Sequence, residues 1–132
     1  MRHLLLATAF LACLFFGTAC TKDQPEGDHP AGFTFRSDSG YTSHNDTVQL
    51  ADTLHIGLTI TKGSDNLRSF YVDVTYDNGP AIRQDSVHVD SDPFTFEQTV
   101  ITRDQAGTEK WTFSVDEYDG DITKQSLTFT MQ

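Results

Sequence analysis

The chain contains 132 residues, of which 19 are acidic and 9 are basic, and its formal net charge at pH 7 is −10. Such an acidic surface repels phosphate backbones and anionic lipid headgroups, which argues against nucleic acid as a partner and against membrane adsorption by charge. Residues 32–132 have the length of one ordinary domain with its own core.

The first 19 residues predict a removable export signal. Arg2 precedes an apolar run from Leu4 to Phe16, which is shorter than the roughly 20 residues of a membrane-spanning helix. Small residues at positions 17–19 lead from this run to Cys20. The pattern resembles the lipobox of envelope lipoproteins of the Bacteroidota type. That resemblance implies cleavage before Cys20, acylation of its thiol and of the new amino terminus, and an outer-membrane lipoprotein that is periplasmic or surface-exposed.

Residues 20–31 predict a lipidated cysteine followed by a flexible, solvated tether. This segment contains two prolines and a glycine and carries no large apolar side chain. Cys13 lies inside the predicted signal, so acylation of Cys20 would leave the mature chain without a free thiol in an oxidising compartment.

The remainder of the chain predicts β-strands, because apolar and polar residues alternate with a period of two. For example, Leu54, Ile56 and Leu58 share one face of their segment, and Trp111 and Phe113 share one face of another. The predicted strands are 32–36, 53–61, 69–76, 81–89, 94–102, 110–116 and 123–131.

Local irregularities and turn residues complete this pattern. In 81–89 the apolar residues change from even to odd positions between Ile82 and Val87, which predicts a bulge near Asp85. In 94–102, Gln98 interrupts the apolar face. Asp77-Asn78-Gly79 predicts a tight hairpin, since Asn-Gly tolerates the positive φ of a type I′ turn. Seven short strands separated by turns predict an all-β, antiparallel sandwich.

The last third of the chain adds a resemblance. Residues 104–116, the Asp119-Gly120-Asp121 turn and the threonine-rich last strand resemble the final hairpin of bacterial immunoglobulin-like domains of the PKD and cadherin-like kind. The resemblance implies a single seven-strand immunoglobulin-like β-sandwich over residues 32–132, and it implies nothing about a ligand.

No catalytic residue is predicted. The chain contains neither Gly-x-Ser-x-Gly nor His-Glu-x-x-His, and it has no glycine-rich phosphate loop. His55 and His88 fall on the outward faces of their predicted strands. The sequence therefore favours a non-enzymatic protein.

Acidic side chains concentrate in the loops that share one pole of such a sandwich. The residues that this arrangement would bring together are Asp65, Asp90, Asp92, Asp116, Glu117, Asp119 and Asp121. Calcium prefers such oxygen ligands, and cadherin-like domains use this pole for calcium, but the spacing matches no calcium motif. The alternative is that these residues only form turns. No metal or other cofactor is assigned, and calcium is kept as the alternative.

The predicted strand 32–36 begins at the same pole, so the acidic pole should face the membrane. The 37–52 connection and the 77–80 and 103–108 loops should then face away. Three tyrosines are candidate ligand contacts: Tyr41 in the long connection, Tyr71 on an outward strand face, and Tyr118 in the last loop.

These observations favour a non-catalytic, lipid-anchored envelope protein with an interaction or scaffolding domain and a protein partner. Two alternatives remain open: a carbohydrate-binding accessory of a glycan-uptake system, and a calcium-binding adhesion module.

Overall fold

The computed structural model describes residues 28–132, so the predicted signal peptide, Cys20 and most of the predicted tether lie outside the described residues. Within the described part the chain forms strands and no helix, and therefore no helix there could cross a membrane. The strands are β1 (Gly32–Phe35), β2 (Asp46–Val48), β3 (Thr53–Thr61), β4 (Leu67–Tyr76), β5 (Ala81–His88), β6 (Phe94–Ile101), β7 (Gly107–Glu117) and β8 (Ile122–Met131).

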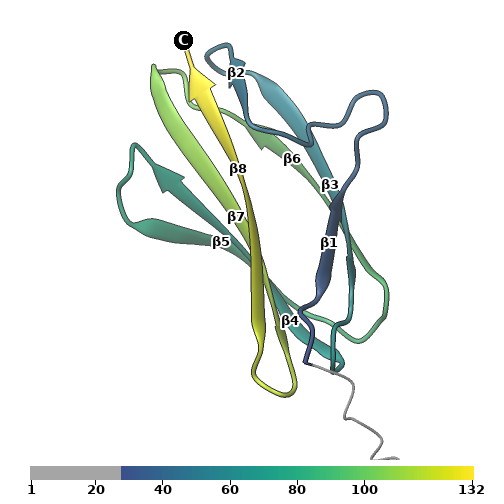
Figure 1. Ribbon diagram of the computed structural model, residues 1–132. Helices are drawn as coiled ribbons and strands as arrows, with labels where there is room; N and C mark the ends of the chain where they lie inside the picture. The colour runs from purple at the N-terminus through teal and green to yellow at the C-terminus, as the bar shows by residue number, and fades with distance from the viewer. Residues whose placement is uncertain (1–27) are drawn as a thin grey trace, which may run out of the picture.

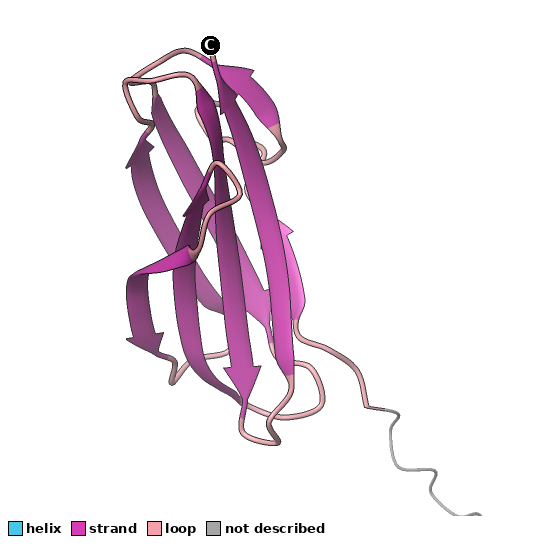
Figure 2. Ribbon diagram, turned by 90° about the vertical axis from the view of Figure 1, so that its left-hand side faces the viewer, coloured by secondary structure: helices cyan, strands magenta, loops and turns pink. Residues whose placement is uncertain are grey.

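Two sheets face each other in a sandwich (Figure 1). The small sheet has the order β1-β3-β6, and the large sheet has the order β2-β8-β7-β4-β5. The chain crosses between the sheets, so that neighbours in sequence such as β3 and β4 belong to opposite layers (Figure 1). Figure 2 shows that strands and the loops between them make up the described part of the chain. The predicted fold class, an all-β immunoglobulin-like sandwich, is confirmed.

The core lies between the inner faces of the two sheets, where the predicted alternation places its apolar side chains. Phe70 is fully buried, and its ring centroid lies 4.7 Å from that of Phe96 and 5.3 Å from that of Phe94. Other fully buried residues at predicted inward positions are Ile56, Ile60, Val72, Val74, Phe113, Val115 and Phe129. Burial of these apolar surfaces is the main force that holds the sheets together.

Residues 28–132 form eight strands where the sequence predicts seven, because the 37–52 connection contributes β2. This strand pairs with β8 in parallel, whereas every other paired strand is antiparallel. The Asn45 side chain supports the junction by accepting a hydrogen bond from the amide of Thr128 at 2.8 Å. A segment of three residues carries too little alternation to be recognised from its own sequence.

β5 is an edge strand of the large sheet, and it contains the predicted irregularity. Asp85 pairs with Val72 and Arg83 with Asp73, so Gln84 is the extra residue of a β-bulge. In the hairpin between β4 and β5, the two turn residues with positive φ lie one position earlier than predicted. The positive φ angles are at Asp77 and Asn78, not at Asn78 and Gly79, and the Gly79 amide donates to Tyr76 O at 2.8 Å.

The end of the predicted tether lies against the domain. Ala31 is buried, and the His29 carbonyl accepts a hydrogen bond from the Ser64 amide at 3.0 Å. Gly63 makes this approach possible, since a Cβ at that position would lie 2.1 Å from the His29 oxygen. The domain therefore begins before residue 32, and its start is fixed at the pole where β3 ends.

Candidate functional site

The acidic pole is built from the loops between β3 and β4, β5 and β6, and β7 and β8. Direct hydrogen bonds hold these loops together, as the grouping by topology predicts. The Lys62 amide donates to Asp92 Oδ1 at 3.0 Å, and the Ser64 hydroxyl lies 3.2 Å from Asp119 Oδ2. Asp65 accepts the amide of Asn66 at 2.7 Å, which is ordinary turn chemistry. Asp90 is exposed on the same pole.

Two of the predicted acidic residues belong to β7 and have structural partners. Asp116 is mostly buried and accepts hydrogen bonds from Nη2 of Arg68 at 2.6 Å and from its Nε at 3.1 Å. Glu117 is buried, and its Oε1 accepts the amides of Gly63 at 2.7 Å and Asp65 at 3.3 Å. Glu117 thus closes the turn between β3 and β4.

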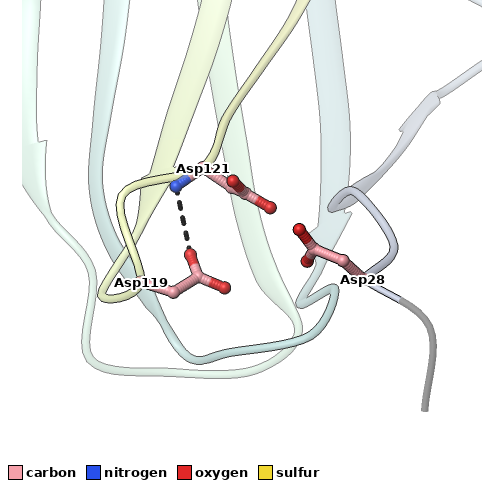
Figure 3. A group of neighbouring side chains, drawn as sticks. All are labelled: Asp28, Asp119 and Asp121. Atoms are coloured by element: carbon pink, nitrogen blue, oxygen red, sulfur yellow. Dashed lines mark hydrogen bonds between the residues drawn. The ribbon is translucent and has the colours of Figure 1, made fainter. Parts of the chain in front are cut away.

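Three other carboxylates meet at the surface of this pole (Figure 3). Asp28, Asp119 and Asp121 each place an oxygen within 4.8 Å of the others. The Ser64 hydroxyl donates to Asp28 Oδ1 at 2.6 Å, and the Asp121 amide donates to Asp119 Oδ1 at 3.1 Å. Repulsion from Asp28 and then from Asp119 raises the pKa of Asp121 above its ordinary value.

This trio is a set of hard oxygen donors, which is the ligand type that calcium prefers. The sequence predicts Asp119 and Asp121 at this pole but not Asp28, which falls in the predicted tether. Only the docking of residues 28–31 against Gly63 and Ser64 brings Asp28 to the other two. Calcium binding stays a prediction, tested below.

The three candidate tyrosines lie on different surfaces. Tyr118 is exposed at the acidic pole, beside a cavity of about 260 Å³ that Asn66 and Asp90 also line. Tyr71 lies on the outer face of the large sheet, where Arg83 covers its ring at 4.3 Å from the centroid. Tyr41 lies over the small sheet. The three rings therefore do not form one binding surface.

Tyr41 is the most constrained of the three. Arg36 stacks on its ring, with Cζ 3.9 Å from the centroid, and donates to the Tyr41 hydroxyl at 2.7 Å. That hydroxyl donates to Glu97 Oε1 at 2.9 Å, which raises the pKa of Tyr41. Gly57 lies beneath both side chains, and a Cβ there would approach Arg36 Cδ and Tyr41 Cε1 to 2.8 Å.

The position of Tyr41 corrects one expectation. The sequence places the whole 37–52 connection at the pole away from the membrane. In the structure, its first part returns to β3, because the Arg36 amide donates to Gly57 O and the Thr42 amide donates to His55 O. The ring of Tyr41 consequently lines a cavity of about 390 Å³ on the outer face of the small sheet, together with His55, Glu97 and Thr99.

The pole opposite the acidic one carries a buried ion pair that the sequence did not predict. Glu109 is buried, and its carboxylate accepts the Arg103 amide at 2.8 Å and the Trp111 indole N–H at 3.2 Å. Arg103 also bonds Asp77 at 2.9 Å, which fixes the hairpin between β4 and β5. The sequence could have indicated this pair. Glu109 lies two residues before Trp111, so both side chains point into the core, and a buried charge requires a partner.

Comparisons with known proteins show the fold. No protein-family model matches the chain, and no curated protein matches it. A conjugative transposon lipoprotein from Bacteroides eggerthii aligns with a TM-score of 0.50 and 13% identity, over 77% of this chain and 98% of its own. A CARDB domain from Pyrococcus furiosus, solved with di-metal ions, aligns with a TM-score of 0.46 and 11% identity, over 78% of this chain and 90% of its own. At 13% identity, the similarity to the Bacteroides eggerthii protein shows a shared fold and not a shared ligand.

Proposed function

We propose that this chain is a non-catalytic lipoprotein of a bacterial cell envelope whose immunoglobulin-like domain binds a protein partner. The observation that carries the proposal is the fixed entry of the chain at the acidic pole. Because His29 and Ala31 are held there, the segment that leads back to Cys20 leaves the domain at a defined place.

Only residues 21–27 separate Cys20 from Asp28. Even fully extended, seven residues reach no more than about 25 Å. Acylation of Cys20 would therefore keep the acidic pole close to the membrane and direct the opposite pole away from it.

The far pole offers a firm surface for a partner. Its loops are joined by backbone hydrogen bonds from Ala51 to Arg103 O at 3.1 Å and from Asp77 to Thr108 O at 2.9 Å. Arg103 adds side-chain bonds across the same loops. A surface that is ordered before binding loses less conformational entropy when a partner docks.

The similarity to the Bacteroides eggerthii lipoprotein supports this proposal, because that protein is also a lipoprotein and nearly its whole chain aligns with the domain described above. The lipobox-like sequence before Cys20 supports it independently.

Membrane fractionation of the full chain tests the anchor. We expect the parent chain in the membrane fraction with a lipid-modified Cys20 by mass spectrometry, and Cys20→Ser in the soluble fraction. An unmodified amino-terminal cysteine would contradict the anchoring proposal.

Site-specific photocrosslinking in intact cells tests the orientation. A photoreactive residue at Asp104, on the far pole, should crosslink to a protein, whereas one at Asp90, on the acidic pole, should not. Both positions are exposed, so they form a matched pair. Protein crosslinks from Asp90 alone would contradict the proposed orientation.

A further inference from the structure

The cavity beside Tyr41 lies on a surface that neither the anchor nor the far pole occupies. It is formed on the outer face of the small sheet, where β3 pairs Gly57 with Glu97 and His55 with Thr99. Its volume of about 390 Å³ falls in the range of small-molecule sites.

The aromatic wall of this cavity is held in place before any ligand arrives. Arg36 covers the ring of Tyr41, Glu97 holds its hydroxyl, and the absence of a side chain at Gly57 lets the ring settle on the strand. A tyrosine on a mobile surface loop would lose side-chain entropy on binding, whereas this ring has already lost it.

Two residues that line the cavity keep a polar atom without a hydrogen-bond partner in residues 28–132. Among the described residues, Glu97 Oε2 makes no hydrogen bond, because both of the contacts to this carboxylate use Oε1. His55 uses Nδ1 toward Thr99 Oγ1 at 3.0 Å, which leaves Nε2 for a ligand. The residues that line this one cavity thus supply a tyrosine ring, a carboxylate oxygen and an imidazole nitrogen.

We propose that this cavity binds a neutral saccharide. A sugar ring has an apolar C–H face that an aromatic ring can cover, and hydroxyl groups at its edge that donate to carboxylates and exchange hydrogen bonds with imidazole. This saccharide site is additional to the proposed protein-binding surface at the far pole and does not depend on it.

The charges around the cavity select a neutral ligand. Arg36 is engaged by Asp38 and Glu97, whose hydrogen bonds raise the pKa of its guanidinium, so its charge is already balanced. A phosphate or uronate would meet the carboxylate of Glu97, and the described residues that line the cavity include no lysine or arginine to offset the repulsion. A row of paired threonines, Thr34, Thr59 and Thr95, continues the same face and offers further hydroxyl groups to a longer saccharide.

Nuclear magnetic resonance titration of the full mature chain tests the proposal. The probes are glucose, galactose, mannose, xylose, N-acetylglucosamine and their neutral oligomers, with galacturonate and glucose 6-phosphate as acidic counterparts. We expect at least one neutral probe to bind with a Kd of about 1 mM or tighter and to shift the amides of Gly40, Glu97 and Thr99. The acidic counterparts should bind at least about tenfold more weakly.

Variants separate this site from the other tyrosines. Tyr41→Ala should weaken binding about tenfold or more, and Glu97→Gln should weaken it without unfolding the domain. Tyr71→Ala and Tyr118→Ala, on other surfaces, should leave binding unchanged.

Three results would overturn the proposal: no shift by any neutral probe at about 50 mM, binding that persists in both Tyr41→Ala and Glu97→Gln, or shifts at these amides caused by a neutral Gly-Ser peptide and not by saccharides. The last result would assign the cavity to a protein partner. None of them affects the fractionation and crosslinking tests, so this inference and the proposed function can fail separately.

Discussion

Nε of Arg103 lies 3.2 Å from Oε1 of Glu109, and the Glu109 side chain is almost completely buried inside the far end of the sandwich. A buried carboxylate that keeps a cation and two further donors is stable, but the same carboxylate without its cation is costly. The pair therefore holds together the loops at this pole, because Arg103 also bonds Asp77 and the Thr108 carbonyl.

Arg103→Ala should lower the free energy of unfolding by clearly more than Arg83→Ala does, because it leaves the charge of Glu109 buried without its partner. Urea unfolding followed by Trp111 fluorescence measures the effect. The control is Arg83→Ala, which breaks the more exposed pair with Asp73 and should cost about 1 kcal/mol or less. Equal losses in the two variants would show that the Arg103–Glu109 pair has no special role.

Gly63→Ala should detach the start of the domain from the acidic pole. Its Cβ would lie 2.1 Å from the His29 carbonyl oxygen, which is backbone and cannot rotate away. We expect the hydrogen bond from the Ser64 amide to His29 O to open, so that hydrogen exchange of this amide becomes faster.

Ser64→Ala is the control for this change. It removes the hydroxyl contacts to Asp28 and Asp119 but keeps the amide bond to His29. In Ser64→Ala, hydrogen exchange of the backbone amide at position 64 should stay slow. Unchanged exchange in Gly63→Ala would mean that the close approach of residues 28–31 does not hold in solution.

Asp121→Asn should raise the melting temperature at pH 7 in the presence of EDTA. The pKa of Asp121 is raised in the folded chain by Asp28 and Asp119, so the folded state binds its proton more tightly than the unfolded state does. Stability therefore falls as the pH rises through the window that begins at the ordinary value of 3.8 and ends at the raised one. The gain from Asp121→Asn should be full above that window and absent below it.

Asp104→Asn serves as the control, since this exposed residue lies at the far pole and its substitution removes one charge without relieving the trio. A similar gain from Asp104→Asn would indicate a general effect of net charge. Adding calcium in place of EDTA tests the metal prediction with the same proteins. A melting-temperature rise that Asp121→Asn abolishes would support a cation at the trio, and no rise at about 5 mM calcium would contradict it.

Glu97→Gln should lower the pKa of Tyr41 toward its ordinary value of 10.0. The hydrogen bond to a charged carboxylate favours the neutral phenol, and the amide of glutamine removes that charge while keeping an acceptor. Alkaline titration of tyrosine ring carbons by nuclear magnetic resonance measures the shift. An unmoved Tyr41 pKa would show that the Glu97 contact is not formed in solution.

Much of the fold is predictable because the period-two pattern is a property of neighbouring residues. Phe70, Val72 and Val74 had to share a face wherever that strand lay, and all three are buried. The grouping of acidic loops at one pole also followed from strand order. β2 escaped prediction because its only partly buried residue is Val48, and its place depends on the exposed edge of β8.

The site was less predictable, because its contacts join residues that are distant in the chain. The sequence by itself determined the alternating strands, the apolar core and the turn residues, since each depends on local backbone preference and on which side chains avoid water. Only the tertiary structure decided that Arg36 reaches Glu97 across 61 residues, that Asp28 joins Asp119 and Asp121, and that Glu109 keeps a cation. Strand register and loop packing decide which of these residues meet. The local sequence around one partner does not indicate which distant residue the other partner is.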